Sequence, residues 1–118
     1  MTTRIHDFFN AWGLSDDTAR ALAIRATLAP EATYGDPRTP APLNGPEEIA
    51  AYVAQFAQAA PGASASVVAD QTQHGLTRAT VAFTMADGMQ QLGQYFITLN
   101  DAGAITAMTG FVGTGAPA

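Results

Sequence analysis

Apolar residues recur every three to four positions in the first half of the chain and every second position in the second half. At the start, Ile5, Phe8, Phe9 and Trp12 have helical spacing. This pattern predicts a short amphipathic helix over residues 3–12, which ends at Gly13.

Two more helices are predicted before the pattern changes. The first begins at Ser15 or Asp16 as its N-cap and ends at about Ala29, because Pro30 cannot continue it. Its core-facing positions are expected to be Ala19, Leu22, Ala23, Ala26 and Leu28. The other follows Asn44, a plausible N-cap, and runs to about residue 59 with Ile49, Tyr52, Val53 and Phe56 as its apolar stripe.

A short strand over residues 32–36 lies between these helices, and a Pro- and Gly-rich segment over 38–46 is expected to be a loop. From residue 64 onward, the alternation predicts four strands over 65–73, 76–85, 89–99 and 104–113. Tight turns such as Asp87-Gly88 separate them, so the strands are expected to form an antiparallel meander. Helices followed by strands predict an α+β domain over residues 1–113, with 114–118 as a disordered tail.

The composition limits the possible functions. Of the 118 residues, 47% are hydrophobic and 13% are charged, which is typical of a globular domain with an apolar cavity or an interface. A net charge of −5 and five scattered arginines argue against nucleic acid and anionic membranes as partners. Without cysteine, a signal-peptide run or a membrane span, we expect a cytoplasmic protein.

The segment Ala32-Thr33-Tyr34-Gly35-Asp36-Pro37 is the main candidate for chemistry. Alternation in a strand places Tyr34 and Asp36 on one face, and Pro37 ends the strand because it has no N–H. If that face points inward, the carboxylate must be hydrogen-bonded, protonated or used in a reaction. The alternative is that Asp36 only shapes a turn, since Asp-Pro commonly opens one.

This segment resembles part of the NTF2-like, or SnoaL-like, superfamily, and the resemblance covers nearly the whole chain. It includes the loop that closes at Gly45, the helix with Tyr52 and Phe56, and the turn Asn100-Asp101-Ala102-Gly103. The resemblance implies three N-terminal helices packed in the concave face of a curved, mostly antiparallel sheet. Together they would leave a conical apolar pocket.

Within the superfamily, the sequence is nearest to the ketosteroid isomerase-like branch. There an aspartate before a proline is the general base, and two donors hold the enolate oxygen in an apolar site. The resemblance gives the role of base to Asp36. It places Trp12 and Tyr95 near the two donors, which are a tyrosine and a protonated aspartate in that branch. The isomerase triad itself is therefore absent, and Trp12 could equally be part of the core.

The other expected pocket residues lie on the inward faces of the predicted helices and strands. Tyr34 and Tyr52 could each point into a cavity or lie at its rim. The full set of expected substrate-binding residues is Trp12, Tyr34, Tyr52, Phe56, Phe83, Tyr95, Met108 and Val112. Phe96 and Phe111 would then lie on the outer sheet face, which suggests a homodimer through that face. No metal or organic cofactor is implied, because His6 and His74 lie far apart without carboxylates at ligand spacing.

Two functions remain open at this point. One is an enzyme that binds a small apolar carbonyl compound and transfers a proton through Asp36. The other is a non-catalytic ligand-binding or dimerisation module with the same fold.

Overall fold

Three helices and six strands occupy residues 3–115, the part of the chain that this computed structural model describes. The helices are α1 (Thr3–Ala11), α2 (Asp17–Arg25) and α3 (Gly45–Ala59). The strands are β1 (Leu28–Gly35), β2 (Leu43–Asn44), β3 (Ser64–Gln73), β4 (Leu76–Thr84), β5 (Gln90–Leu99) and β6 (Ile105–Val112).

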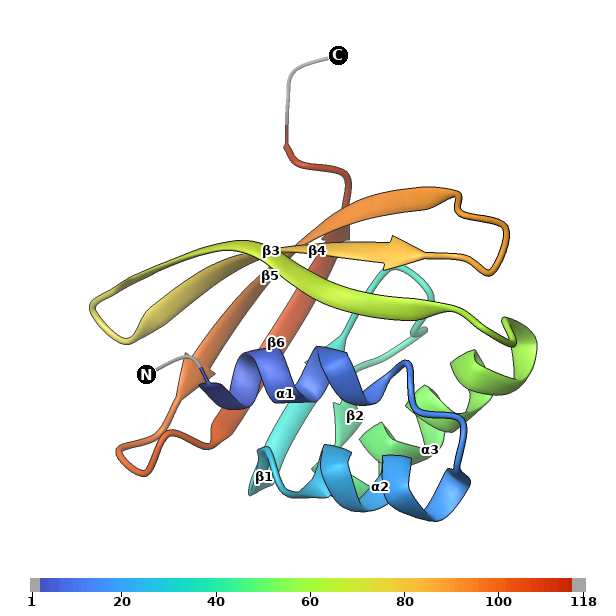
Figure 1. Cartoon of the computed structure of the whole chain (residues 1–118). Helices are drawn as coiled ribbons and strands as arrows, with labels where there is room; N and C mark the ends of the chain where they lie inside the picture. The colour runs from blue at the N-terminus through green and yellow to red at the C-terminus, as the bar shows by residue number, and fades with distance from the viewer. Residues whose placement is uncertain (1–2, 116–118) are drawn as a thin grey trace.

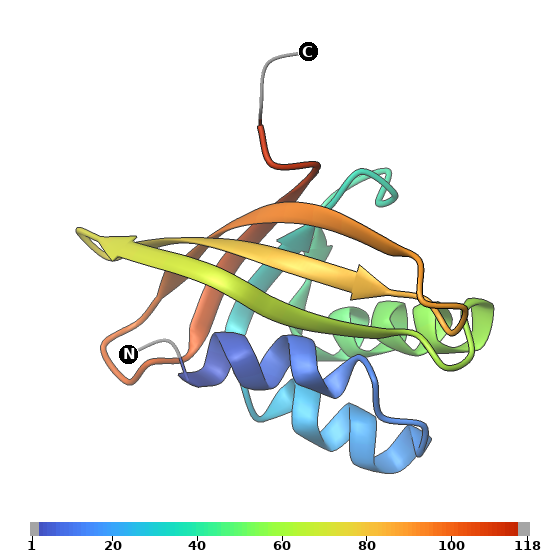
Figure 2. The same ribbon diagram turned by 45° about the horizontal axis from the view of Figure 1, so that its top comes forward.

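The six strands form one curved sheet in the order β2-β1-β6-β5-β4-β3, with the helices on one side of it (Figures 1 and 2). All neighbouring strands are antiparallel except β1 and β6, which are parallel. The α+β prediction is confirmed. However, α3 follows β1 and β2 in the chain, so only α1 and α2 precede the first strand.

The predicted meander of four strands is confirmed, and each strand boundary lies within about one residue of its predicted position. The turn signals explain this agreement, because they fix where each strand stops. In the Asp87-Gly88 turn, Gly88 has a φ of 92°, which residues with a Cβ rarely adopt. Of the predicted tail, the structure describes 114–115, where the carbonyl of Thr114 accepts a hydrogen bond from the Gln94 side chain. Residues 116–118 lie outside the described part.

The end of the second helix was predicted wrongly. Helix α2 ends at Arg25, and the Thr27 hydroxyl donates to the carbonyl of Ile24 at 2.8 Å. Strand β1 then begins at Leu28 and contains Pro30. The β1–β6 pairing shifts register between Leu28 and Thr33, so the missing N–H of Pro30 breaks no hydrogen bond of the ladder.

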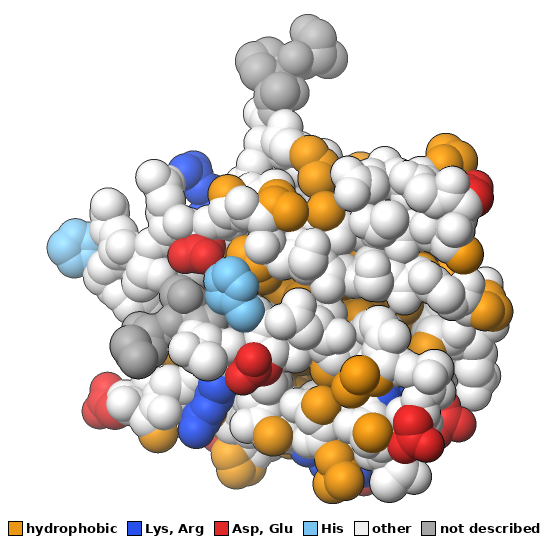
Figure 3. Space-filling model, viewed as in Figure 1, with side chains coloured by type: hydrophobic (Ala, Val, Ile, Leu, Met, Phe, Trp, Pro, Cys, Tyr) orange, Lys and Arg blue, Asp and Glu red, His pale blue; other side chains and the backbone are white. Residues whose placement is uncertain are grey.

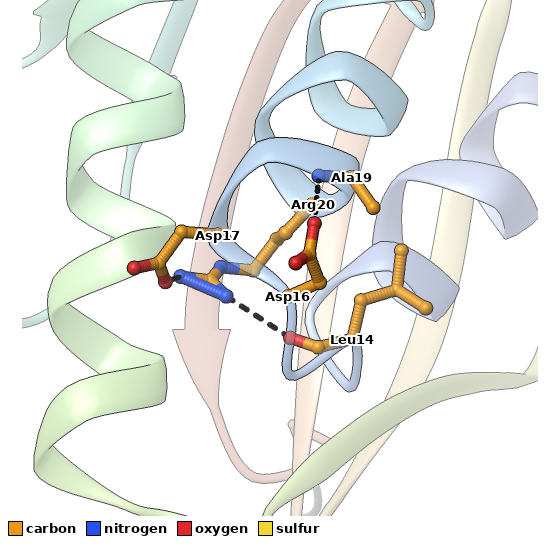
Figure 4. A network of polar contacts seen from close by, with 5 residues as sticks. All are labelled: Leu14, Asp16, Asp17, Ala19 and Arg20. Atoms are coloured by element: carbon orange, nitrogen blue, oxygen red, sulfur yellow. Dashed lines mark hydrogen bonds and ion pairs between the residues drawn. The ribbon is translucent and has the colours of Figure 1, made fainter.

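The buried face of α2 also differs from the prediction. Leu22 is 61% exposed, and Ala19 and Ala26 are exposed as well, whereas Ile24 and Arg20 are buried. Figure 4 shows the reason: the Arg20 guanidinium donates to the carbonyl of Leu14 and to Asp17 at the start of the helix.

The start of α2 is capped as predicted. The Asp16 carboxylate accepts a hydrogen bond from the backbone N–H of Ala19 at 2.8 Å (Figure 4). Asp16 thereby satisfies one of the helix's free N-terminal donors. Together with Arg20, this contact fixes the connection between α1 and α2.

The expected loop over 38–46 contains a short strand that was not predicted. In β2, Leu43 and Asn44 pair with Tyr34 and Thr33 of β1. Asn44 then precedes α3, but its side chain makes no cap; instead, the Glu48 carboxylate accepts the N–H of Asn44 at 2.9 Å. This contact resembles the second half of a capping box, with the glutamate at N4 instead of N3, and it positions the start of the helix that carries Tyr52.

The surface carries no large cluster of arginines on the face shown in Figure 3, in agreement with their scattered positions in the sequence. On the face shown in Figure 3, arginine side chains appear as separate spots. Phe96 and Phe111 lie on the outer face as predicted, with ring centroids 5.8 Å apart, and Phe111 also reaches the edge of the cavity described below. Among the described residues, no helix is both long and apolar enough to cross a membrane.

Candidate functional site

A cavity of about 490 Å³ opens between α3, the β4–β5 hairpin and the segment after β1. This volume suits a small organic ligand, since such pockets typically measure ~300–1,000 Å³. The residues around it are Trp12, Asp36, Pro37, Arg38, Tyr52, Gln55, Phe56, Ala59, Phe83, Met85, Gln91, Leu92, Gly93, Tyr95, Phe111 and Val112. Most are apolar or aromatic, and Asp36 is their only carboxylate.

One oxygen of Asp36 shapes the turn that follows β1. Its Oδ1 accepts the backbone N–H groups of Arg38 at 2.9 Å and Thr39 at 3.2 Å. The Thr39 hydroxyl in turn accepts the backbone N–H of Asp36 at 3.1 Å. The turn interpretation of Asp36 is therefore confirmed for this oxygen, and the turn holds the carboxylate in a fixed orientation.

The other oxygen faces a cluster of tyrosines. Oδ2 of Asp36 accepts the hydroxyl of Tyr52 at 2.6 Å and that of Tyr34 at 2.7 Å. The Tyr34 hydroxyl also lies 2.8 Å from the hydroxyl of Tyr95. Asp36 thus accepts four hydrogen bonds in all, which is about as many as a carboxylate can take. We call Asp36, Tyr34, Tyr52 and Tyr95 the tyrosine network.

Burial keeps these phenols protonated. It is the largest cause that raises the pKa of Tyr34, Tyr52 and Tyr95 well above the ordinary value of 10.0. The negative charge of Asp36 adds to the increase, and for Tyr34 and Tyr52 their hydrogen bonds to Asp36 do so too. Near neutral pH, each tyrosine therefore carries one proton that it can donate.

Trp12 forms an apolar wall beside this network, with its ring centroid 6.3 Å from those of Tyr34 and Tyr52. Its ring centroid lies 4.9 Å from that of Phe56 and 5.6 Å from that of Phe83, both in edge-to-face arrangements. Its indole nitrogen is buried and has no hydrogen-bond partner among the described residues. A buried donor without a partner costs free energy, so this N–H is available to an acceptor on a ligand.

The structure places the expected site residues in two groups. At the cavity are Trp12, Asp36, Tyr52, Phe56, Phe83, Tyr95 and Val112. Tyr34 and Met108 are fully buried and lie outside the set that lines it. Val112 shares the inward side of the sheet with its partner Gly93, but it is 63% exposed and lies at the cavity mouth.

Sequence reasoning missed one residue on which the network depends. Gly110 of β6 pairs with Tyr95 of β5, and the Tyr95 ring lies directly over it. A Cβ at position 110 would lie 2.5 Å from the Tyr95 ring. The available signal was a glycine inside a strand, which often marks such a close approach.

The described residues offer no group of three or more His, Cys, Asp or Glu side chains that could hold a metal ion. What the arrangement offers a ligand is one carboxylate, phenol oxygens, an indole N–H and aromatic surface, with the side chains of Arg38, Gln55 and Gln91 also in the lining. This set suits a small, mostly apolar molecule that carries a polar group.

No protein-family model and no curated protein matches this sequence. Solved structures do match. A candidate isomerase of the SnoaL-like family from Agrobacterium tumefaciens has a TM-score of 0.84 and 24% identity, over 95% of this chain and 96% of that one. A candidate SnoaL-like polyketide cyclase from Jannaschia sp. CCS1 has a TM-score of 0.76 and 16% identity, over 94% and 83%.

A third structure is a hypothetical protein from Catenulispora acidiphila with a ketosteroid isomerase-like fold, in complex with trimethylamine. Its TM-score is 0.75 at 12% identity, over 91% of this chain and 82% of that chain. The chain has the SnoaL-like, NTF2-like fold. At these identities the likeness establishes the architecture, and the chemistry has to be argued from the site itself.

In this SnoaL-like fold, Asp36 and Tyr95 both line the cavity. The parallel pairing of β1 with β6 brings the two together. It sets Tyr34 beside Met108, while β6 pairs on its other edge with the strand that carries Tyr95.

Proposed function

We propose that this protein is a proton-transfer enzyme that binds a small apolar carbonyl compound in a conical pocket, with Asp36 as the general base. The observation that carries the proposal is the Asp36 carboxylate, which lies at the wall of a cavity lined mostly by aromatic and apolar residues. Solved structures described as a candidate isomerase and a candidate polyketide cyclase support an enzymatic function for this fold.

The proposed reaction moves one proton between two carbons. From a β,γ-unsaturated ketone, Asp36 removes a proton from the α-carbon next to the carbonyl, and the electron pair of the broken C–H bond forms a dienolate. Asp36 then returns the proton to the γ-carbon, so that the double bond moves to the α,β position and the carbonyl re-forms. Donors in an apolar setting stabilise the enolate oxygen, and enolisation of a ketone beside a carboxylate requires no cofactor.

Two residues are suited to assist this step. Tyr52 is only half-buried, so its hydroxyl is the Asp36 partner that a substrate could displace to reach Oδ2. The indole N–H of Trp12 has no partner among the described residues, so it is free to donate to the enolate oxygen. An indole N–H is a weaker acid than a phenol, so its contribution as a donor is correspondingly modest.

The test is Asp36→Asn assayed with a β,γ-unsaturated ketone, by the ultraviolet absorbance of the conjugated product. Loss of the general base is expected to lower kcat by roughly 10²–10⁴-fold. Asp70→Asn is the matched control, because Asp70 pairs with His6 outside the cavity. Unchanged turnover in a folded Asp36→Asn variant would show that Asp36 is not the base.

A second candidate function is a non-catalytic ligand-binding or dimerisation module. The observation that favours it is that protein donors already occupy all four acceptor positions of Asp36. Asp36 would then serve stability alone, and ligands would bind without turnover. In both functions, the homodimer would form through the outer sheet face around Phe96 and Phe111, and the oligomeric state in solution tests that part.

A further inference from the structure

The directions of the hydrogen bonds in the tyrosine network follow from counting protons. An ionised carboxylate only accepts, and a phenol has one proton to donate. Tyr34 and Tyr52 both spend their proton on Oδ2 of Asp36. In the 2.8 Å contact between Tyr34 and Tyr95, the donor must therefore be Tyr95.

This arrangement determines what the cavity offers a ligand. All three phenol protons are used inside the network, two on Asp36 and that of Tyr95 on Tyr34, so Tyr52 and Tyr95 present only oxygen lone pairs at the cavity wall. A ligand carbonyl oxygen needs a donor. Within the described part of the chain, the buried donor at the cavity that lacks a partner is the indole N–H of Trp12. In this state the network does not donate to a carbonyl ligand.

We propose that Tyr34 is a positioning residue that couples the protonation of Asp36 to the hydrogen-bond direction at Tyr95. When Asp36 takes up a proton, Oδ2 donates to Tyr34, Tyr34 turns its O–H to Tyr95, and Tyr95 turns its O–H into the cavity. Tyr95 becomes a donor to the ligand oxygen at the same step that places charge on that oxygen.

The step balances in atoms and charge. The proton leaves a ligand carbon and forms an O–H bond on Asp36, and the C–H electron pair becomes the enolate. The two phenol O–H groups only rotate, and neither loses its proton. The protonated Oδ2 could instead point at Tyr52. A bound enolate selects the arrangement through Tyr34, because only that one gives its oxygen a further donor.

The turn after β1 makes this coupling testable without any reaction. Oδ1 accepts the N–H groups of Arg38 and Thr39, so an asparagine at position 36 must keep its carbonyl oxygen there. Its NH₂ group then faces Tyr34 and Tyr52. Asp36→Asn is therefore a fixed imitation of the protonated carboxyl group, with Tyr95 turned permanently toward the ligand.

The experiment measures binding of acetylnaphthalene, which has a carbonyl acceptor and no donor, by isothermal titration calorimetry. Ethylnaphthalene is the matched probe without an acceptor. One additional hydrogen bond is expected to make Asp36→Asn bind the ketone about 3- to 10-fold more tightly than the unmodified protein, with no gain for the hydrocarbon. The infrared carbonyl stretch of the bound ketone is expected at a lower frequency in Asp36→Asn.

Tyr34→Phe separates this coupling from the simple loss of a negative charge. Without the Tyr34 hydroxyl, Tyr95 loses its acceptor. Its O–H is then free to donate to the ligand, whether residue 36 is aspartate or asparagine. Adding Asp36→Asn to Tyr34→Phe is therefore expected to give no further gain, whereas adding it to Tyr52→Phe gives the full gain. A charge effect alone would persist in all three backgrounds.

Three results would overturn the coupling: no gain in Asp36→Asn, an equal gain in the Tyr34→Phe background, or no measurable binding of the ketone. If the Tyr34→Phe variants do not fold, the infrared shift between Asp36→Asn and the unmodified protein still shows whether Tyr95 donates to the ketone.

The catalytic meaning of the coupling rests on the proposed function, but the binding test does not. Binding as expected without turnover of a β,γ-unsaturated ketone would refute the proposed function alone.

Discussion

Raising the pH above 10 is expected to unfold this protein, because the three phenols of the tyrosine network stay protonated only in the folded state. The chain contains three tyrosines, and all three belong to the network. Burial, as the largest cause, raises the pKa of each phenol in the folded state. In the unfolded chain the same groups titrate at about 10.

The direction of the effect follows from proton counts. Below pH 10 both states hold the phenol protons, so these groups add no pH dependence. Above about pH 10 the unfolded chain has lost protons that the folded protein still holds. The free energy of unfolding therefore falls as pH rises through this window, until the folded-state phenols also ionise.

The magnitude depends on how many phenols stay protonated. Each retained proton lowers stability by ~1.4 kcal/mol per pH unit. Tyr34 and Tyr95 are almost fully buried, so together they give ~2.7 kcal/mol per pH unit, with a smaller addition from half-buried Tyr52. By roughly pH 12 the loss is ~5 kcal/mol, which is comparable with the whole stability of a small domain.

The assay follows tyrosinate by ultraviolet difference absorbance and secondary structure by circular dichroism in the same pH titration. Both signals are expected to change together in one steep transition well above pH 10. The Tyr52→Phe variant removes the most exposed phenol. In this variant, the pH of tyrosine ionisation and the pH of unfolding are expected to agree more closely. Ionisation of two or more tyrosines near pH 10 in a protein with native circular dichroism would refute the buried network and the donor directions derived from it.

Two further predictions test the packing around the network and the outer face. Gly110→Ala is expected to destabilise the protein by ~1–3 kcal/mol in chemical denaturation, because the new Cβ would clash with the Tyr95 ring. The neighbouring exposed Thr109→Ala serves as its control, and an equal effect of the two would contradict the close approach. Phe111→Gln is expected to convert a homodimer to a monomer in analytical ultracentrifugation while stability changes by less than about 0.5 kcal/mol. A monomeric unmodified protein at high concentration would show that the outer face is not the dimer interface.

The sequence was most informative where local chemistry alone decides the structure. The Asp87-Gly88 turn and the alternation on either side of it predicted β4 and β5 almost to the residue. The same reasoning failed at the end of α2, where helix-favouring residues continue beyond Arg25. There, Thr27 bonds back to Ile24, and the chain is taken into the sheet at Leu28.

The buried face of α2 shows why helical periodicity can mislead. The apolar Leu22 appeared to be a core residue, yet it is exposed, and Arg20 is buried in its place. Arg20 is inside because it satisfies the carbonyl of Leu14 and pairs with Asp17. Helical periodicity takes into account only whether a side chain is apolar, and not the carbonyl of a preceding turn that needs a donor.

For the site, strand alternation put Tyr34 and Asp36 on one face of a strand, and the family resemblance suggested that Tyr95 faces inward. Neither could show that Tyr34 contacts Tyr95, because that contact depends on the parallel pairing of β1 with β6. These strands lie about 70 residues apart in the sequence, and no local pattern specifies their register. Gly110 was missed for the same reason, since its role appears only when Tyr95 lies across from it.

The two interpretations of Asp36, as a turn residue and as a site residue, are complementary in the structure. The N–H groups of Arg38 and Thr39 hold Oδ1, and this fixes the plane of the carboxylate. With that plane fixed, Oδ2 has to face Tyr34 and Tyr52. The turn therefore orients the carboxylate toward the cavity. It also forces an asparagine at position 36 to present its NH₂ group to the phenols, so that the binding comparison has one defined geometry.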